Sequence, residues 1–180
     1  MADRKDALVA AAGFINKVPE IVKEYGNEFT VATVGTIKVT PHSVNVIPGT
    51  CTFSLEIRDQ SAEVMKLIEN HLRQLLEDIC KKYGVTSTFV PTSYHDPAPM
   101  SELVRGTIEE AVKELGIDYT VIPSGAFHDS LIMTSVFPTG MIFVPSKDGI
   151  SHSRYEYTAP EDIENGCNVL LNTVLKLDEK

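Results

Sequence analysis

The sequence predicts an α/β protein in two parts: a helix-and-strand unit over residues 1–97, and a unit of alternating helices and strands over residues 98–180. Apolar residues in the first part recur partly at helical spacing and partly at every second position, which is typical of helices packed on a half-buried sheet. Residues 91–101 hold three prolines and are typical of a linker. Beyond them, short apolar strands alternate with helices, which favours a parallel sheet buried on both faces.

The first helix is predicted to start at about Arg4, with Asp3 as its cap, and to stop at Gly26. Proline lacks a backbone N–H and its ring crowds the preceding turn, so we expect Pro19 to kink or divide this helix.

Strand-forming residues follow the first helix. Residues 29–39 predict a strand in which Gly35 marks a bulge or a close approach, and residues 44–47 predict a short second strand piece. Pro48-Gly49 predicts a turn into residues 50–58, where apolar and polar side chains alternate. Together these segments predict a hairpin with one buried and one polar face.

The strongest helical pattern of the chain starts after the cap Ser61 and stops at Gly84, and residues 85–90 predict another strand. The order is therefore helix, strand, strand, helix, strand. One strand before residue 1 would complete a ferredoxin-like split βαβ unit. Without it, we expect the sheet to have a vacant edge position.

The second part predicts three helices and two strands. The helices are expected at residues 101–115, at residues 129–136 and after the capping box Thr158-x-x-Glu161. The strands are expected at residues 119–122 and 141–144.

Composition excludes several functional classes. The 180 residues are 43% hydrophobic and 23% charged, as in an ordinary globular protein. The net charge of -9 argues against a nucleic-acid partner. The sequence contains no apolar run of about 18 residues, so it predicts no membrane-spanning helix. The start of the chain does not have the pattern of a signal peptide. Three cysteines without a CxxC spacing indicate reduced thiols, so we expect a cytoplasmic protein.

Two histidines follow successive predicted strands of the second part. His128 and His152 lie in loops at the carboxyl ends of these strands, where open α/β sheets bind ligands. Imidazole is both a common metal ligand and a general acid or base near neutral pH. A lone loop histidine is more often a solvated surface residue than a functional one. Because two histidines lie in equivalent loops here, the functional and the surface interpretations become about equally probable. Asp129 and Glu156 could accompany them, although the candidate ligands are too few for a closed tetrahedral site.

Asn45 and Arg58 form a second candidate pair, in the first part of the chain. A guanidinium can grip a carboxylate through two parallel hydrogen bonds, and an amide can add a third. An arginine at a strand end is nevertheless usually solvated. The pattern alone therefore favours a surface arginine without a binding role.

Five segments of the sequence resemble, in order and spacing, the N-carbamoyl-L-amino-acid hydrolase and allantoate amidohydrolase family of di-metal amidases. They are TVGTIKV, PHSVNVIPG, FSLEIRD, SGAFHDS and MIFVPSKDGISHSRYEYT, of which the last is the most specific.

The resemblance implies a zinc-peptidase-type α/β catalytic domain, here present as its C-terminal part over residues 98–180. It also implies a ferredoxin-like lid that dimerises, here residues 1–97 without the first strand. In the family two ions, zinc or manganese, activate a water that attacks a ureido or amide carbonyl. The resemblance makes His152 the last metal ligand and His128 a catalytic residue that contacts the substrate. It makes Asn45 and Arg58 the lid pair that binds the substrate carboxylate, and lid residues can complete a neighbouring subunit's site.

The chain also departs from the family pattern. The other four metal ligands, the general-base glutamate and a lid histidine would all lie before Met1. Phe127 and Ser130 stand where the family usually has Gly and Ala, and Phe127 could narrow or block the pocket. One ligand does not hold a metal cluster, so we expect this chain to be inactive alone. It could be an expressed fragment, a truncated gene product or half of a split enzyme whose N-terminal half is its partner.

Two other functions remain open. One is an aminoacylase or dipeptidase of the wider zinc-peptidase group, which keeps the chemistry and changes the substrate. The other is a non-catalytic module that dimerises or binds a carboxylate. Because half of a catalytic sheet would expose apolar edges, we expect a homodimer or a higher oligomer in each case.

Overall fold

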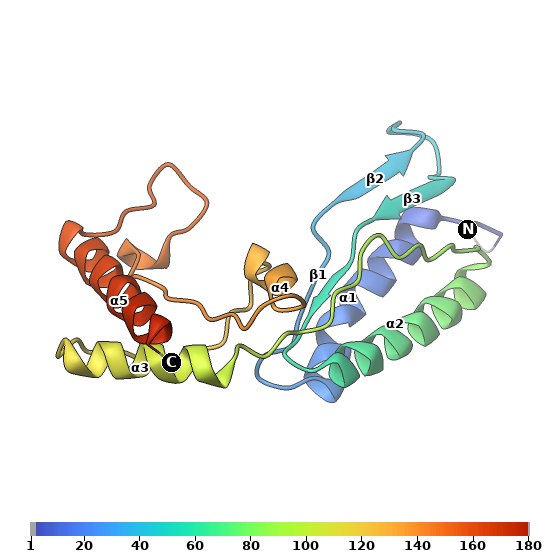
Figure 1. Cartoon of the computed structure of the whole chain (residues 1–180). Helices are drawn as coiled ribbons and strands as arrows, with labels where there is room; N and C mark the ends of the chain where they lie inside the picture. The colour runs from blue at the N-terminus through green and yellow to red at the C-terminus, as the bar shows by residue number, and fades with distance from the viewer. Residues whose placement is uncertain (1–2, 180) are drawn as a thin grey trace. The chain divides into compact units, whose positions relative to one another are not determined.

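A computed structural model of the chain describes residues 3–179 and divides into two compact units, which meet between Pro97 and Ala98 (Figure 1). The chain mixes helices and strands, which confirms the predicted fold class. Among the described residues the strands all lie in the first unit, however, and the second unit is built from helices and irregular segments. The assignment of the units as lid and catalytic part remains a prediction.

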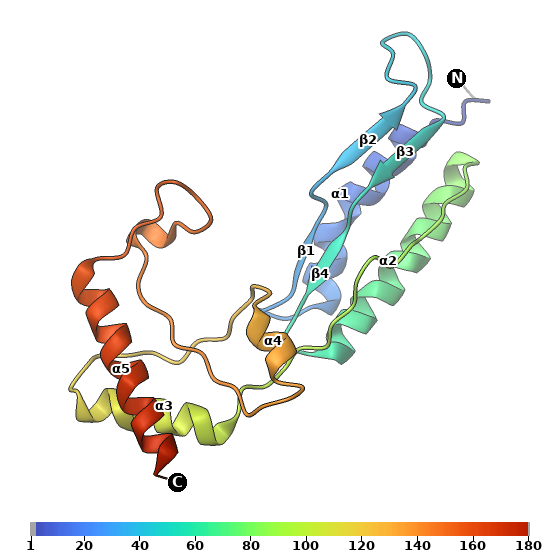
Figure 2. The same ribbon diagram turned by 45° about the horizontal axis from the view of Figure 1, so that its top comes forward.

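The first unit consists of two long helices and two short antiparallel ladders (Figure 2). β1 pairs with β4, from Val31 opposite Arg58, and β2 pairs with β3, from Ile37 opposite Phe53. Both helices pack against each other and against the strands. In chain order the elements are α1 (Ala7–Tyr25), β1 (Val31–Thr33), β2 (Ile37–Thr40), β3 (Thr50–Phe53), β4 (Glu56–Arg58) and α2 (Ala62–Tyr83).

Helix α1 differs from its prediction in two respects, the residue that caps its start and the effect of Pro19. Its cap is Asp6 rather than Asp3, because the Asp6 carboxylate accepts hydrogen bonds from two amides of the first turn, both at 3.1 Å. Pro19 lies inside one continuous helix and does not divide it. Phe14 and Val18, which are at most 3% exposed, anchor the helix in the core on the turn before the proline. This packing offsets the lost backbone hydrogen bond.

The strands are shorter than predicted. The expected strand over residues 29–39 is interrupted around Gly35 and becomes β1 and β2, and residues 44–47 are not a strand. The β2–β3 ladder ends where Thr40 faces Thr50, so residues 41–49 are the connection of a hairpin and have no partner to pair with. Val44 is accordingly fully exposed.

The alternation over residues 50–58 is confirmed, because its apolar positions are half-buried and its polar positions are exposed. The inward side chains pack on a core of fully buried residues from both helices, which are Phe14, Val18, Ile68 and Leu72. Each of these contributes on the order of 1.5–3 kcal/mol through apolar burial.

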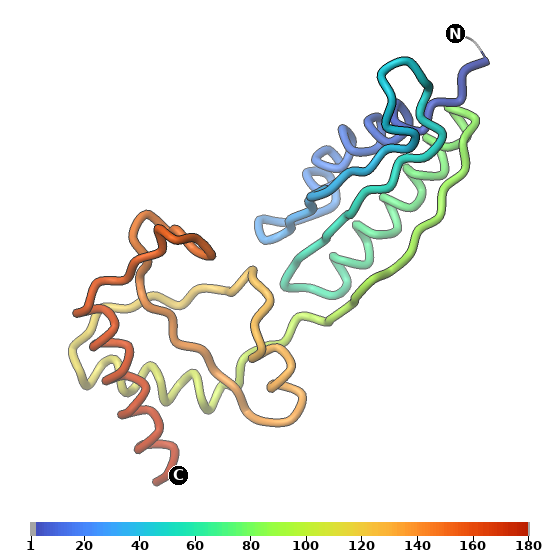
Figure 3. Tube along the Cα trace, turned by 90° about the horizontal axis from the view of Figure 1, so that it is seen from above, coloured from blue at the N-terminus to red at the C-terminus, as the bar shows by residue number. Residues whose placement is uncertain are grey.

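Helix α2 is confirmed with both ends. The Ser61 side chain accepts from the Val64 amide at 3.3 Å, and Gly84 ends the helix with a left-handed φ of 63°. The strand expected over residues 85–90 is not formed. The chain turns back there and runs along α2 (Figure 3), but a strand needs a paired neighbour and no described strand lies in register with it.

In the second unit α3 (Glu102–Glu114) packs against α5 (Pro160–Asp178), with Thr107, Ala111, Val169 and Thr173 among the buried residues. Between them lie the short helix α4 (Asp129–Met133), which ends earlier than predicted, and the 3-10 turn η1 (Lys147–Gly149).

Two further expectations for this unit were wrong. The strands expected at residues 119–122 and 141–144 are absent from the described chain, since apolar segments form a parallel sheet only when neighbouring strands hold them. The capping box at Thr158 is absent too, because Ala159 is the cap and Pro160 is the first helical residue. Proline suits that position, where no amide partner is needed.

Across residues 3–179, none of the helices combines the length and the apolar character that crossing a bilayer requires.

Candidate functional site

Arg58 lies at the end of β4 on its exposed face. Its Nη2 atom donates to both carboxylate oxygens of Glu56, at 2.9 and 3.0 Å, because residues two apart on a strand project from the same side. The two side chains are 46% and 59% exposed. Exposed ion pairs of this kind contribute about 0–1 kcal/mol, so another carboxylate can replace Glu56 at little cost.

Asn45 lies in the connection between β2 and β3, not at the start of a strand as predicted. Its Oδ1 accepts from the Ser43 hydroxyl at 2.9 Å, which fixes the side chain within this turn. The residue is exposed, so its amide is accessible to a ligand or a second chain.

The structure does not bring Asn45 and Arg58 together. Arg58 ends the segment that begins at Thr50, and eight residues of extended chain span about 26 Å. Asn45 lies in the connection beyond Thr50, and Figure 2 shows this connection at the end of the β2–β3 ladder that is away from β4. A small acid spans only a few ångströms, so one copy of the chain does not present both side chains to the same acid. The assignment of the pair to substrate binding stays a prediction.

His128 is the residue before helix α4 and is half-buried. Its ring meets the ring of Phe143 edge-on, with centroids 5.6 Å apart and planes at 60°. The Ser130 hydroxyl contacts the Met141 sulfur at 2.8 Å, which also joins the start of α4 to this apolar segment. This aromatic contact packs one side of the His128 ring against Phe143.

His152 lies in the exposed loop after η1 and has a left-handed φ of 55°. Its backbone N–H donates to the Glu156 carboxylate at 2.7 Å. Glu156 thus shapes the loop through the backbone of His152. Asp148, within the preceding turn η1, also has a positive φ, of 56°. Two such non-glycine residues four positions apart are uncommon, and strained backbone gathers at functional sites.

The described residues do not by themselves bring together a complete set of metal ligands. Within residues 3–179 no three His, Cys, Asp or Glu side chains gather as metal ligands would. Phe127, which could narrow a pocket, is 54% exposed.

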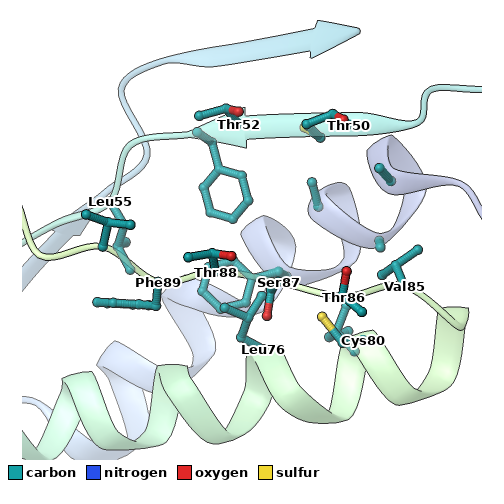
Figure 4. A pocket seen from close by; sticks show the side chains of 18 of the residues that line it. Thr50, Thr52, Leu55, Leu76, Cys80, Val85, Thr86, Ser87, Thr88 and Phe89 are labelled. Atoms are coloured by element: carbon teal, nitrogen blue, oxygen red, sulfur yellow. The ribbon is translucent and has the colours of Figure 1, made fainter.

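A large cavity lies in the first unit and contains none of the four predicted site residues. Its volume is about 880 Å³, and it lies between α1, β3, α2 and the segment from Val85 to Tyr94 (Figure 4). The cavity was not predicted from the sequence. The relevant sign was the predicted order of elements, helix, strand, strand, helix, strand, which leaves one strand position of the sheet vacant.

Comparisons with known proteins give a consistent result over almost the whole chain. The sequence profile of peptidase family M20/M25/M40 matches residues 11–176. The N-carbamoyl-L-amino acid amidohydrolase of Geobacillus stearothermophilus is 38% identical over 98% of this chain and 43% of its own length. The allantoate amidohydrolase of Bacillus subtilis is 33% identical over 97% of this chain and 42% of its own length.

Among solved structures, AtUAH in complex with (S)-hydroxyglycine matches with a TM-score of 0.92 and 35% identity, over 100% of this chain and 43% of that one. The chain thus spans less than half the length of the relatives it matches. These matches confirm the resemblance that the five segments of the sequence indicated. By profile, sequence identity and fold, the chain belongs to the M20/M25/M40 family of peptidases.

Proposed function

We propose that this chain is the C-terminal part of a metal-dependent amidohydrolase that cleaves a C–N bond of an N-carbamoyl amino acid or a related ureido acid. The observation that carries the proposal is the 38% identity with an N-carbamoyl-L-amino acid amidohydrolase over 98% of the chain. The structures of AtUAH with (S)-hydroxyglycine and with glyoxylate support a small acid as the substrate class.

Arg58 is the residue that binds the substrate carboxylate in this proposal. Its guanidinium already holds a carboxylate in a two-oxygen contact, that of Glu56. A substrate carboxylate has the same charge and shape, so it can take the place of Glu56 and accept from the same Nη2 atom.

In this proposal the Asn45 and the Arg58 of one chain belong to two different substrate sites of a dimer. Arg58 ends β4, whereas Asn45 lies in the connection at the far end of the β2–β3 ladder, so both can contact one substrate only when two chains contribute to each site. A homodimer with two-fold symmetry meets this condition, since each chain then supplies its Arg58 to one site and its Asn45 to the other.

His128 and His152 serve the reacting end of the substrate. His128, held beside Phe143, contacts the substrate and is the catalytic residue of this chain. His152, in its left-handed loop, contributes one metal ligand. The remaining ligands for zinc or manganese come from outside the described residues, so the chain alone is inactive. We place the protein in the cytoplasm because all three cysteines are free thiols.

The proposal is tested with the purified chain and with a complementing N-terminal part taken from the Geobacillus relative. The chain alone is expected to hold no stoichiometric zinc or manganese and to leave N-carbamoyl amino acids uncleaved. The mixture or a fusion of the two parts is expected to hydrolyse them. Stoichiometric metal and turnover in the isolated chain would contradict the incomplete site, and a fusion that cleaves only N-acyl amino acids or dipeptides would contradict the substrate class.

A further inference from the structure

We infer that Asp59, together with Thr30, positions Arg58: the two side chains fix the end of β4 and so hold the backbone from which the guanidinium reaches the substrate carboxylate. This role deepens the proposed function and rests on it in one respect, the binding of that carboxylate by Arg58. The contacts that carry the inference lie in the turn before β1 and in the turn after β4.

Arg58 lies at the end of a very short ladder. β1 and β4 have three residues each, and Arg58 opposite Val31 is the terminal pair. Among the described residues, neither strand pairs with a further strand. A two-stranded ladder of this length is marginally stable by itself, and its terminal pair is the first to open. An ordered guanidinium at this place therefore requires support from outside the ladder.

The Asp59 carboxylate supplies this support directly after Arg58. It accepts hydrogen bonds from the Thr30 hydroxyl, from the Asn27 side-chain amide at 3.3 Å and from the Ser61 backbone N–H at 2.8 Å. The first two donors belong to the turn before β1, and the third belongs to the turn after β4. The carboxylate thus ties the two turns together at the open end of the ladder, where β1 and β4 lie side by side (Figure 2).

Thr30 is the buried member of this cluster and is 8% exposed. Its hydroxyl accepts from the Asn27 backbone N–H at 2.8 Å while it donates to Asp59. Gly26 lets the turn close this tightly, because a Cβ at that position would lie 2.8 Å from the Thr30 hydroxyl oxygen. A hydroxyl that donates and accepts at once has a defined orientation, so the carboxylate that it holds is fixed as well.

These contacts exceed what the start of α2 requires. Ser61 caps α2 through its own side chain. That cap needs neither Thr30 nor Asn27, which are 29 and 32 residues away from Asp59 in the sequence. The long-range contacts join the two strands that carry the Arg58 pair. The cluster therefore acts on the strand end as well as on the helix.

Asp59 does not compete with the substrate for the guanidinium. Exposure alternates through Ile57, Arg58 and Asp59, as half-buried, exposed and half-buried, so the aspartate and the arginine point to opposite sides. Glu56, by contrast, shares the face of Arg58 and bonds to it. Ile57 packs against the core of the unit. Arg58 thus lies between two anchored neighbours, and a side chain on a fixed backbone loses less entropy when it binds a ligand.

Variants of the full chain test this role by NMR titration with N-carbamoylalanine. Thr30→Val removes the hydroxyl at nearly constant shape and should weaken binding by about threefold to tenfold, because the strand end loosens. Thr30→Ser keeps the hydroxyl and should stay within about twofold of wild type. Thr36→Val is the matched control and should bind as wild type, since it makes the same change at an exposed threonine between β1 and β2.

A double-mutant cycle separates positioning from a general loss of structure. Asp59→Ala removes the acceptor of all three hydrogen bonds and should weaken binding by about tenfold. In the Arg58→Ala background the same change should cause no further loss, because the residue through which Asp59 acts is absent. If Asp59→Ala does not fold, the two Thr30 variants in the same background complete the cycle.

Relaxation of the arginine Nε–H groups measures the positioning without a ligand. Thr30→Val should lower the order parameter of the Arg58 Nε–H group, and Thr30→Ser should restore it. The Arg73 Nε–H group, which donates to Glu69 at 2.8 Å within α2, is the internal control and should be unchanged. A contact that only stabilises the fold would leave the Arg58 group unchanged too.

Three outcomes would overturn the inference. Unchanged binding in Thr30→Val and Asp59→Ala, with weakened binding in Arg58→Ala, would reject the positioning role and leave the proposed function intact. Equal losses from Asp59→Ala with and without Arg58 would show that the cluster acts on the fold alone. Unchanged binding in Arg58→Ala would reject the arginine's part in the proposed function, and the positioning role with it.

Discussion

At the scale of single residues, the ion pair of Glu56 and Arg58 links the fold to the proposed function. The strand places both side chains on one exposed face, and the Arg58 Nη2 atom donates to both oxygens of the Glu56 carboxylate. In the proposed function, a substrate carboxylate would take the place of Glu56. The exchange of one carboxylate for another is nearly balanced, so small changes in either residue should alter affinity measurably.

We expect Arg58→Ala to weaken binding of an N-carbamoyl amino acid by about tenfold to a hundredfold, because two charge-assisted hydrogen bonds are lost. Glu56→Gln should strengthen binding by up to about fivefold, since it removes the competing charge. Titration calorimetry on the full chain measures both, and Lys38→Ala, an exposed cation of β2, is the matched control. Equal affinity of wild type and Arg58→Ala would exclude the proposed role of the arginine.

Glu69 predicts a pH dependence of stability. Partial burial raises the pKa of Glu69, but hydrogen bonds and charge from Arg73 and Lys66 outweigh it and hold the pKa below its usual 4.5. A lowered pKa in the folded state contributes stability above pH 4.5 that disappears as the pH falls through the folded value. Glu69→Gln should therefore flatten the acid limb of the stability curve in urea unfolding. An unchanged acid limb in the variant would contradict this contribution.

At the scale of elements, single residues in the sequence determine where helix α2 begins and ends. Packing in the core determines that helix α1 continues through Pro19. Gly84 ends α2 because its left-handed φ suits glycine, and Ser61 begins it through a side-chain cap. Pro19, which is usually a breaker, lies within α1 because the buried residues around it hold the helix together.

The cap of α1 is open to a direct test. Asp6→Ala should lower the free energy of unfolding by about 1 kcal/mol, because two first-turn amides lose their acceptor. Asp6→Asn should recover most of this loss. Asp3→Ala should change stability by less than about 0.5 kcal/mol, as expected for an exposed residue outside the cap. A larger effect at Asp3 than at Asp6 would restore the original helix start.

At the scale of the whole molecule, the chain consists of two compact units with separate cores. The core of the first unit is built on Phe14 and Leu72, and that of the second lies where α3 meets α5. Each unit should therefore respond to its own core substitutions.

Leu72→Ala should destabilise the first unit by about 2–5 kcal/mol through the cavity that it creates. Val169→Ala, a matched deletion in the second unit, should lower the stability of that unit only. Hydrogen exchange of the backbone amides in each unit measures the loss of stability caused by Leu72→Ala and by Val169→Ala separately. Equal loss of protection in both units from either substitution would show that they unfold as one.

Much of the fold could be predicted from the sequence. The start and stop of α2, the alternation over residues 50–58 and the helical nature of residues 102–114 depend on neighbours in sequence. The failed strands were predicted from apolar composition, which shows that a segment is fit for a sheet but not that a partner lies beside it. Residues 85–90 and 141–144 are the main examples.

The sequence by itself determined the family and the candidate residues, since the motifs around Arg58 and His152 are local strings that remain readable in part of a domain. Only the tertiary structure decided that Arg58 at the end of β4 lies far from Asn45 in the β2–β3 connection, and that a cavity lies between β3 and the segment after α2. The physical reason is that side-chain identity and helix ends are set over a few residues. Distances between residues and the pairing of strands depend on segments far apart in the chain.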